Sequence, residues 1–453
     1  MTLRERLESG SGDLVKGEAA RPVAARYDPA RAALKMRVHA KLLDLVDLGA
    51  MENMPEVKLR AELKLLVEKI LFSERIATNE AERQQLILAI QNEVLGLGPI
   101  EPLLADATVS DILVNNWSHV YVERHGRLEL TDIHFNDDRH LMTIIEKIVS
   151  RIGRRVDESS PMVDARLPDG SRVNAVIPPL AVDGPVLSIR RFAAIPLTIG
   201  DIVKYGTLTE DMGKIIAALV RTKTNILISG GTGSGKTTLL NIMSAFIPHT
   251  ERIVTIEDAA ELRLQQPHVV RLETRPPNVE GKGEIAQRAL VRNTLRMRPD
   301  RIVVGEVRGA EVLDMLQAMN TGHEGSMTTV HANTARDALT RLENMVGIAG
   351  LSIPPKTMRQ QIVSAISVVI QIARLSDGKR KVISIQEITG MESDMGSMQE
   401  IFAFEQTGIA ADGTVLGNFR ATGIRPHFSE RLRVRGAPLP DSLFDPARGG
   451  GQA

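Results

Sequence analysis

The sequence has no cysteine, few aromatic residues and no long apolar run. Without cysteine, disulfides, thiol catalysis and cysteine metal sites are excluded, which agrees with a reducing compartment. Aromatic residues make up only 3% of the chain, with Trp117 the single tryptophan, so the cores must be mainly aliphatic. No uninterrupted apolar segment of about 18 residues appears, and the charged, polar start does not resemble a signal peptide. We therefore expect a cytoplasmic protein that reaches a membrane only through its partners.

The chain also lacks an excess of either charge, with 56 basic and 56 acidic residues. A zero balance does not favour bulk nucleic-acid binding, although local basic patches stay open. The length of 453 residues is typical of about three domains. The chemistry must therefore be sought in local motifs.

Residues 230–237 have the pattern of a phosphate-binding loop, G-x-x-x-x-G-K-[ST]. A short apolar run precedes it, as a buried strand would, and a helical apolar pattern follows from Leu239. The glycines let successive N–H groups point at a polyphosphate, and the next helix presents its N-terminus to the same phosphates. Lys236 can place its charge on the β- and γ-phosphates of ATP, and Thr237 can ligate Mg²⁺. The expected nucleotide-binding residues of the loop are Gly230, Gly231, Thr232, Gly233, Ser234, Gly235, Lys236, Thr237 and Thr238.

The periodicity of the chain changes along its length. Apolar residues between 34 and 97 recur at helical spacing and predict three short helices. Residues 98–198 read as several strands with one helix, and residues 199 to about 390 alternate helix and strand like a mainly parallel sheet. We predict a disordered tail at 1–33, a helical bundle at 34–97, an α+β domain at 98–198, an α/β nucleotide-binding domain with C-terminal additions at 199–437, and a loose tail at 438–453.

Three further motifs follow predicted strands of the α/β domain, where open α/β sheets bind ligands. Residues 256–262 hold several carboxylates, which suit metal coordination and water activation, although a solvated acidic loop would have the same pattern. The strand at 301–304 ends in Gly305-Glu306, which is the Walker B arrangement with Glu where most phosphate-loop ATPases have Asp. A third strand ends at His331, which suits a γ-phosphate sensor, although a lone histidine is more often structural.

Four motifs in this order resemble the type II/type IV secretion ATPases. They are GGTGSGKTT, the "Asp box" TIEDAAEL, an atypical Walker B motif ending in GEVRG, and the "His box" TGHEGSMTTVHAN. The stretches DARLPDGSRVNAVIPP and LSIRRF resemble the family's preceding domain. The chain looks most like the CpaF/TadA-type motor of tight-adherence (Flp) pili, because it has Ala259 where the pilus extension and retraction branches usually have proline.

This resemblance implies a RecA-like ATPase domain, a preceding α+β (PAS-like) domain and a small N-terminal helical bundle. It implies that Glu261 polarises the attacking water and that Glu306 organises Mg²⁺ and the water. His331 would sense the γ-phosphate, with His323 as a second candidate. The family forms hexamers with nucleotide between domains and subunits, so arginines of the α+β domain are candidates for reaching the phosphates, although arginines on a hairpin can also simply face solvent. The candidates are Arg166, Arg172, Arg190 and Arg191, with Arg296, Arg298 and Arg308 near the Walker B strand.

The resulting hypothesis is a hexameric motor that hydrolyses ATP with Mg²⁺ at the cytoplasmic face of the inner membrane. It would drive assembly, or retraction, of a tight-adherence pilus through an inner-membrane platform protein, without binding nucleic acid. One alternative is a ring-shaped nucleic-acid translocase, which predicts a basic channel and turnover stimulated by DNA. Another is an adaptor that binds ATP without hydrolysis, which the presence of Glu261 and Glu306 disfavours.

Overall fold

The computed structural model describes residues 29–45, 54–124, 126–151, 153–191, 197–277, 282–350 and 353–448. The chain folds into two compact units, Met1–Ala193 and Ala194–Ala453. Among the described residues, no helix combines the length and apolar character needed to span a bilayer. Residues 1–28 of the expected tail at 1–33 lie outside the described residues, whereas residues 29–33 belong to a helix and correct that expectation.

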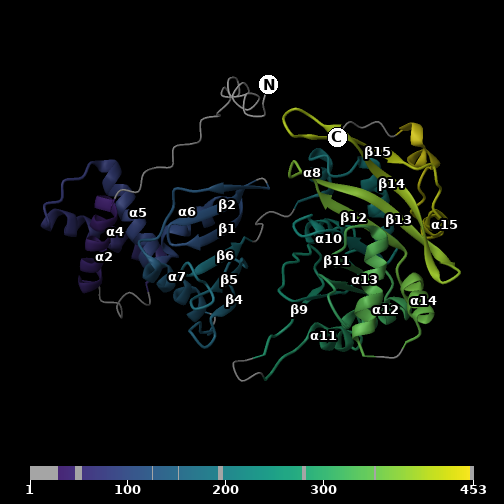
Figure 1. The fold of residues 1–453 in the computed structure, drawn as a ribbon, viewed down its shortest axis with the longest axis horizontal. Coiled ribbons are helices and arrows are strands. Elements are labelled where there is room, and N and C mark those ends of the chain that lie inside the picture. The colour runs from purple at the N-terminus through teal and green to yellow at the C-terminus, as the bar shows by residue number, and fades with distance from the viewer. Residues whose placement is uncertain are drawn as a thin grey trace, which may run out of the picture. The chain divides into compact units, whose positions relative to one another are not determined.

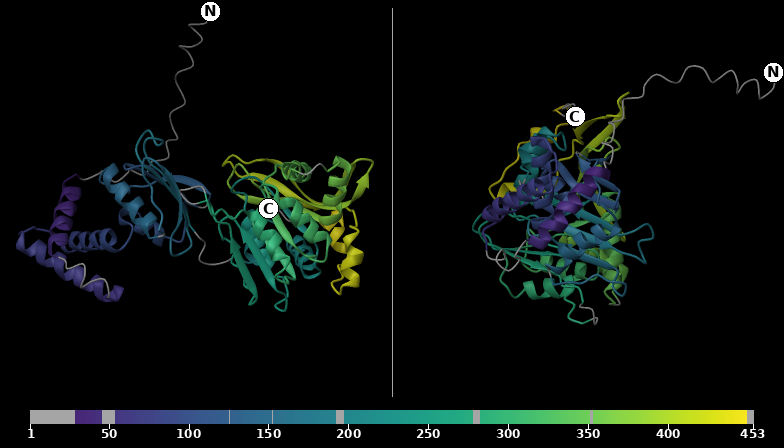
Figure 2. Two further views of the ribbon diagram at one scale, coloured as in Figure 1. Left: turned by 90° about the horizontal axis from the view of Figure 1, so that it is seen from below. Right: turned by 90° about the vertical axis from the view of Figure 1, so that its left-hand side faces the viewer.

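The first unit begins with three helices, α2 (Pro29–Leu45), α4 (Glu56–Ser73) and α5 (Glu80–Leu95), which are the purple and blue helices of Figures 1 and 2. Asn79 starts α5 with a capping box, because its side chain accepts from Glu82 N and the Glu82 side chain accepts from Asn79 N. The apolar faces of the three helices meet in one core. The three helices expected from the apolar spacing are confirmed.

The remainder of the first unit is an antiparallel sheet with a helix on one face. Its elements are η1 (Gly98–Ile100), α6 (Glu101–Ala105), β1 (Val109–Asn116), β2 (His119–Arg124), β3 (Arg127–Leu130), α7 (Asp138–Ser150), β4 (Met162–Arg166), β5 (Arg172–Val176) and β6 (Val186–Arg190). The described strands form a six-stranded sheet in the order β3-β2-β1-β6-β5-β4. Alternate residues such as Val173 and Ala175 face the core that α7 covers, and Arg172 and Asn174 lie on the opposite face.

The second unit is built on a nine-stranded sheet in the order β15-β14-β13-β12-β7-β11-β10-β8-β9. The strands are β7 (Ile226–Ser229), β8 (Ile253–Glu257), β9 (Val269–Glu273), β10 (Arg301–Val304), β11 (Met327–Val330), β12 (Val368–Arg374), β13 (Arg380–Glu392), β14 (Met395–Ile409) and β15 (Val415–Ala421). The strands from β12 to β9 in this order are parallel, and β13, β14 and β15 continue the sheet antiparallel beyond β12 (Figure 1).

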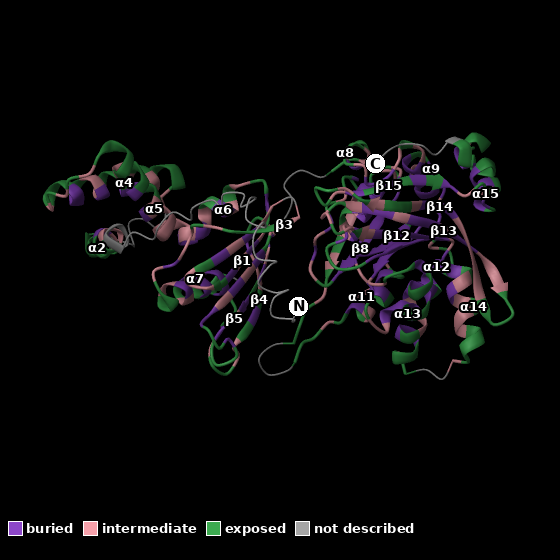
Figure 3. Ribbon diagram, turned by 45° about the horizontal axis from the view of Figure 1, so that its top comes forward, coloured by how far each residue is buried: buried purple, intermediate pink, exposed green. Residues whose placement is uncertain are grey.

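Helices cover both faces of this sheet, so its central strands are buried throughout (Figure 3). Ile226 and Ile228 of β7 pack in one core and Leu227 packs in the other. The first core holds α8 (Ile199–Lys204), α9 (Glu210–Arg221), α10 (Lys236–Ser244) and α15 (Phe428–Val434); the second holds α11 (Gln287–Thr294), α12 (Glu311–Asn320), α13 (Ala335–Ile348) and α14 (Pro355–Ala365). This arrangement confirms the α/β fold expected from the alternating pattern.

The C-terminal region departs from one expectation. The expected C-terminal additions to the α/β domain are present as β14 and β15 followed by α15. Residues 438–448, however, do not form a loose tail. The short helices η2 (Asp441–Phe444) and η3 (Pro446–Arg448) are formed, and Leu443 and Phe444 are buried in the first core. Phe444 packs against Phe402 with ring centroids 6.3 Å apart, so the apolar pair inside a polar, proline-rich stretch anchors the end of the chain.

Candidate active site

The parallel strands bring the sequence motifs to one edge of the sheet. Val330 of β11 pairs with Ser229 of β7, and Val304 of β10 pairs with both Thr328 of β11 and Ile256 of β8. Because these strands run in the same direction, the residues that follow them lie together. The phosphate loop, the acidic loop 256–262, Gly305-Glu306 and His331 therefore surround one site.

The phosphate loop is a cradle that only glycine can form at key positions. Gly233 and Gly235 have φ values of 70° and 98°, and Gly235 is the N-cap of α10. A Cβ on Gly230 would lie 2.3 Å from the Ile372 carbonyl oxygen and 2.6 Å from Ser234 Oγ. The first N–H groups of α10 are thus directed, with the positive end of the helix dipole, at the space inside the loop.

Lys236 lies folded over this loop. Its Nζ donates to the carbonyl oxygens of Gly230 at 3.1 Å and Gly231 at 3.0 Å. The residue is only 7% exposed, and burial lowers the pKa of its ammonium group. A buried ammonium group whose nearest neighbours are carbonyl oxygens and an imidazole ring gains from an anion, so the position suits a phosphate group.

Glu306 follows the Walker B strand β10, and its carboxylate contacts His331 and Arg308. Its Oε1 lies 3.0 Å from His331 Nε2, and its Oε2 accepts from Arg308 at 2.9 Å. Burial raises the pKa of Glu306, but the hydrogen bond from Arg308 and the neighbouring positive charges outweigh that effect, so its pKa lies below the usual value. Burial and the charge of Lys236 lower the pKa of His331. The site therefore offers a carboxylate beside a neutral imidazole at neutral pH.

The acidic loop contributes a buried carboxyl group that the sequence patterns did not single out. Glu257 Oε2 accepts from the backbone N–H groups of Glu261 at 2.7 Å and Leu262 at 2.9 Å, which fixes the course of the loop. Its Oε1 is buried without a hydrogen-bond partner among the described residues. Burial raises the pKa of Glu257 to about 7. Its position at a strand end is visible in the sequence, but its burial beneath Gly305 is a tertiary contact.

Glu261 and Arg308 belong to the same cluster. The charge of Glu261 acts on both Glu257 and Arg308. Arg308 lies 3.5 Å from Asp258 as well as contacting Glu306, so it bridges the acidic loop and the Walker B strand. Of the three arginines expected near that strand, Arg308 is the one at this edge. Arg296 and Arg298 precede β10 and lie at its opposite end.

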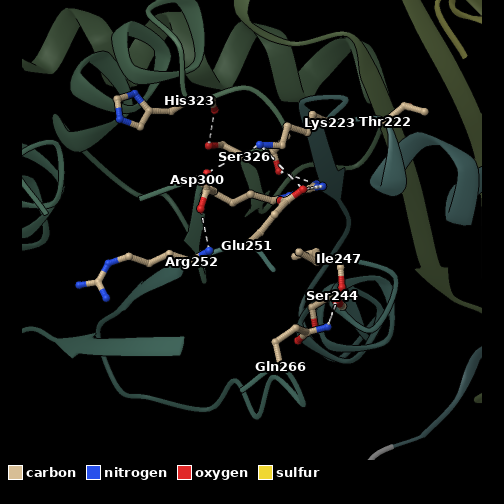
Figure 4. A network of polar contacts seen from close by, with 12 residues as sticks. Thr222, Lys223, Ser244, Ile247, Glu251, Arg252, Gln266, Asp300, His323 and Ser326 are labelled. Carbon is tan, nitrogen blue, oxygen red and sulfur yellow. Dashed lines mark hydrogen bonds and ion pairs between the residues drawn. The ribbon is translucent and has the colours of Figure 1, made fainter. Parts of the chain in front are cut away.

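His323 was expected at the nucleotide site, and the structure places it elsewhere. It precedes β11, whereas His331 follows it, so the two histidines lie at opposite ends of a buried strand. Figure 4 shows His323 in a different polar network, where its carbonyl oxygen accepts from Ser326 Oγ at 2.8 Å. The same network contains the buried Arg301, which donates to Glu251 at 2.5 Å. Within one chain, His323 supports the packing of the sheet and does not reach the phosphate loop.

Three of the four candidate arginines of the first unit share one row of its sheet. Arg166 pairs with Arg172, and Arg172 pairs with Arg190, so the three side chains project from the same face. Arg190 also donates to Asp111 at 3.1 Å. Arg191 is different and corrects the expectation, because its guanidinium donates to the backbone carbonyl oxygens of Val109, at 2.9 Å, and Asp106. Arg191 therefore stabilises the start of β1.

The loop geometry fits a nucleotide with a divalent cation. In the described part of the chain, no three or more His, Asp or Glu side chains gather in a way that could hold a metal. A cation at this site would therefore need phosphate oxygens beside protein ligands, which is how Mg²⁺ is usually held with nucleotides. Thr237, in the first turn of α10, and Glu306 are the residues of this edge that would hold it.

These features define a RecA-like P-loop ATPase. A glycine cradle at a helix N-terminus lies beside strand-end carboxylates, on a sheet covered by helices on both faces. The chain belongs to the Type II/IV secretion system protein family, whose model matches residues 93–411. It is accordingly an ATP-hydrolysing secretion ATPase.

Several known proteins are similar to this chain. A putative conjugal transfer protein of Mycobacterium tuberculosis is 37% identical over 334 residues, covering 72% of this chain and 94% of that protein. The conjugal transfer protein TrbB of Rhizobium radiobacter is 35% identical over 283 residues, covering 61% of this chain and 83% of that protein. Among solved structures, the VirB11 ATPase of the Brucella suis type IV secretion system, in complex with sulphate, has 28% identity and a TM-score of 0.35, covering 63% of this chain and 91% of that one.

Proposed function

We propose that this chain is the motor of a tight-adherence type IV pilus, of the CpaF/TadA type. The observation that carries the proposal is the run of contacts from Lys236 through His331 to Glu306. It joins a phosphate-binding cation, a neutral imidazole and a carboxylate at the mouth of one loop. Ala259 in the Asp box supports the tight-adherence branch over the other pilus branches. The motor would act on an inner-membrane platform protein.

Each residue of the cluster has a proposed role. Lys236 and the loop N–H groups bind the β- and γ-phosphates of ATP. Thr237 and Glu306 hold Mg²⁺, which when bound neutralises charge on the phosphates. Glu261 polarises the attacking water, and His331 contacts the γ-phosphate, because its ring lies 3.3 Å from the ammonium group of Lys236.

The assembly we propose is a homo-hexamer at the cytoplasmic face of the inner membrane, associated with the membrane only through its partners and without nucleic acid. Arg166, Arg172 and Arg190 would approach the nucleotide from the first unit. We also propose that the chain before the ATPase domain divides into a helical bundle at 34–97 and an α+β domain at 98–198.

Steady-state ATP hydrolysis by wild-type protein and Lys236→Ala tests the enzymatic part. We expect turnover by wild type and a loss of about 10²-fold or more in the variant, because the γ-phosphate loses its cation. Lys214→Ala is the matched control, since Lys214 is exposed and paired only with Glu210 and Asp211 on its own helix. Wild-type protein without ATP turnover would refute the motor. Turnover stimulated by DNA would favour a translocase.

Light scattering after size-exclusion chromatography, with and without a non-hydrolysable ATP analogue, tests the proposed hexamer. A monomer under both conditions contradicts a hexamer.

The names of the relatives support one alternative, a motor of conjugal type IV secretion. The Lys236→Ala allele in the organism that carries the chain separates the two. Loss of surface pili with normal plasmid transfer supports the pilus motor, whereas normal pili with lost plasmid transfer supports the conjugal one.

A further inference from the structure

The hairpin between β12 and β13 touches the phosphate loop on the side away from the acidic residues. β12 lies on one side of β7 in the sheet, and β11, β10 and β8 lie on the other. Arg380 of this hairpin donates from Nε to the Gly233 carbonyl oxygen at 3.1 Å. An Nη atom of Arg374 lies 3.6 Å from the position that a Cβ on Gly233 would occupy. Two guanidinium groups therefore border the loop opposite Glu306 and His331.

The hairpin is held firmly in that position. Ile372 packs its carbonyl oxygen against Gly230, which leaves no room for a side chain there. At the turn, Asp377 accepts from Lys379 N at 3.0 Å and from Val415 N of β15 at 3.1 Å. The Asp377 side chain is only 5% exposed. The antiparallel extension of the sheet thus fixes the two arginines against the loop.

The electrostatics of this place favour an anion. Both guanidinium groups lie beside the N-terminus of α10, which carries a partial positive charge, and beside the loop that holds Lys236. A polyphosphate bound in the loop would place its negative charge beside these two guanidinium groups and Lys236. Arginine suits this task because its planar fork of N–H donors matches phosphate oxygens.

We propose that Arg374 and Arg380 form a basic wall that binds the nucleotide at its α-phosphate and nucleoside end and sets nucleotide affinity. The groups suited to cleavage, Glu306 and His331, occupy the other side of β7, so the γ-phosphate lies there and the remainder of the nucleotide extends toward β12. The two arginines take no part in breaking the phosphate bond. The inference rests on ATP hydrolysis at this same site and adds residues to it.

Equilibrium binding of ADP to the full chain, by calorimetry, is the primary test. Arg374→Ala and Arg380→Ala should each weaken ADP binding about 10-fold or more, because each variant loses a charge-assisted hydrogen bond to the nucleotide. Arg380→Lys should recover part of the loss. Inorganic pyrophosphate, which lacks the nucleoside end, should lose less affinity than ADP. Arg420→Ala is the control, since Arg420 lies on β15 paired with Glu405.

The kinetics of ATP hydrolysis distinguish a role of the two arginines in nucleotide binding from a purely structural role. We expect KM for ATP to rise in both alanine variants, with kcat within about 3-fold of wild type. Unchanged ADP affinity in a variant that hydrolyses ATP would overturn the inference, as would a fall in kcat at unchanged KM or an equal loss for pyrophosphate. If Arg380→Ala does not fold, Arg374→Ala decides. Absence of turnover in the wild type would instead refute the proposed function.

Discussion

Lys236 and His331 lie side by side at the mouth of the phosphate loop, with Nζ 3.3 Å from Nε2 and 3.4 Å from Nδ1. Nε2 is in turn 3.0 Å from Glu306 Oε1. The two residues are far apart in the chain, and the adjacent parallel strands β7 and β11 bring them together. Burial and the charge of Lys236 lower the pKa of His331, so the imidazole is neutral at pH 7. A single imidazole ring therefore lies between the lysine of the phosphate loop and the Walker B carboxylate.

Glu306→Gln should separate binding from hydrolysis. Glutamine keeps the size of the side chain and its contact with Arg308, but it removes the charge that orders the cation and the water. We expect ADP affinity within about 3-fold of wild type and ATP turnover reduced about 10²-fold or more. Calorimetry and a phosphate-release assay measure the two quantities. Full turnover in this variant would rule out the role given to Glu306.

Arg172→Ala and Arg190→Ala should behave differently from Arg191→Ala. Arg172 and Arg190 project from the open face of their sheet, so we expect each variant to lose about 10-fold or more in turnover with little change in Tm. Arg191 is bonded to backbone carbonyl oxygens of Asp106 and Val109, so its loss should lower Tm by several degrees, since about 1–3 kcal/mol is at stake. Thermal unfolding and ATPase assays distinguish these outcomes. Equal behaviour of the three variants would contradict the division.

Glu257→Gln should change how stability depends on pH. Burial raises the pKa of Glu257 from 4.5 to about 7. The folded protein then binds more protons than the unfolded chain between these values, so this group makes stability fall as pH rises from 4.5 to 7. Glutamine still accepts from the N–H groups of Glu261 and Leu262 without titrating. We expect a flatter profile and a gain on the order of 1–3 kcal/mol above pH 7.

Urea unfolding at several pH values measures the effect of Glu257→Gln. Glu284→Gln is the control, because Glu284 is exposed. A variant that is no more stable than wild type at pH 8 would show that the pKa of Glu257 is not raised.

Glu93→Gln should weaken the contact between the helical bundle and the helix α7 that covers the sheet of the first unit. The Glu93 carboxylate contacts Lys35 of α2 and lies 2.9 Å from His140 Nε2 of α7. Although burial raises its pKa, the contacts with His140 and Lys35 hold the pKa of Glu93 down to about 2. We expect the variant to lose about 3 kcal/mol of stability at pH 7, because breaking a buried pair leaves its partners uncompensated.

The sign of the pH dependence provides a check on Glu93. A carboxyl group with a lowered folded-state pKa stabilises the protein above its usual value of 4.5, and this contribution is lost as pH falls toward 2. The difference between wild type and Glu93→Gln should therefore shrink over that range in denaturant titrations. Glu68→Gln, which removes an exposed pair with Lys64 at 4.0 Å, should cost less than about 1 kcal/mol. A constant difference at all pH values would contradict the ion-pair account.

The sequence by itself determined the features that depend on residues close together in the chain. The glycine loop with Lys236 could be recognised because its function requires those residue types in one short stretch. The three N-terminal helices and the alternating strands followed from the 3.6- and 2-residue periods of apolar side chains. The carboxyl-end positions of Glu306 and His331 were also visible, since each follows an apolar run.

The tertiary structure decided everything that depends on strand order and burial. His323 and His331 belong to one motif, yet β11 separates them and only His331 meets Lys236. Glu257 is one of several acids in its loop, and burial beneath Gly305 alone distinguishes it. The contact of Arg380 with Gly233 requires β12 to pair with β7, a pairing between segments far apart in sequence. Local periodicity fixes where a strand lies in the chain, but long-range pairing decides which strands become neighbours and which side chains share a site.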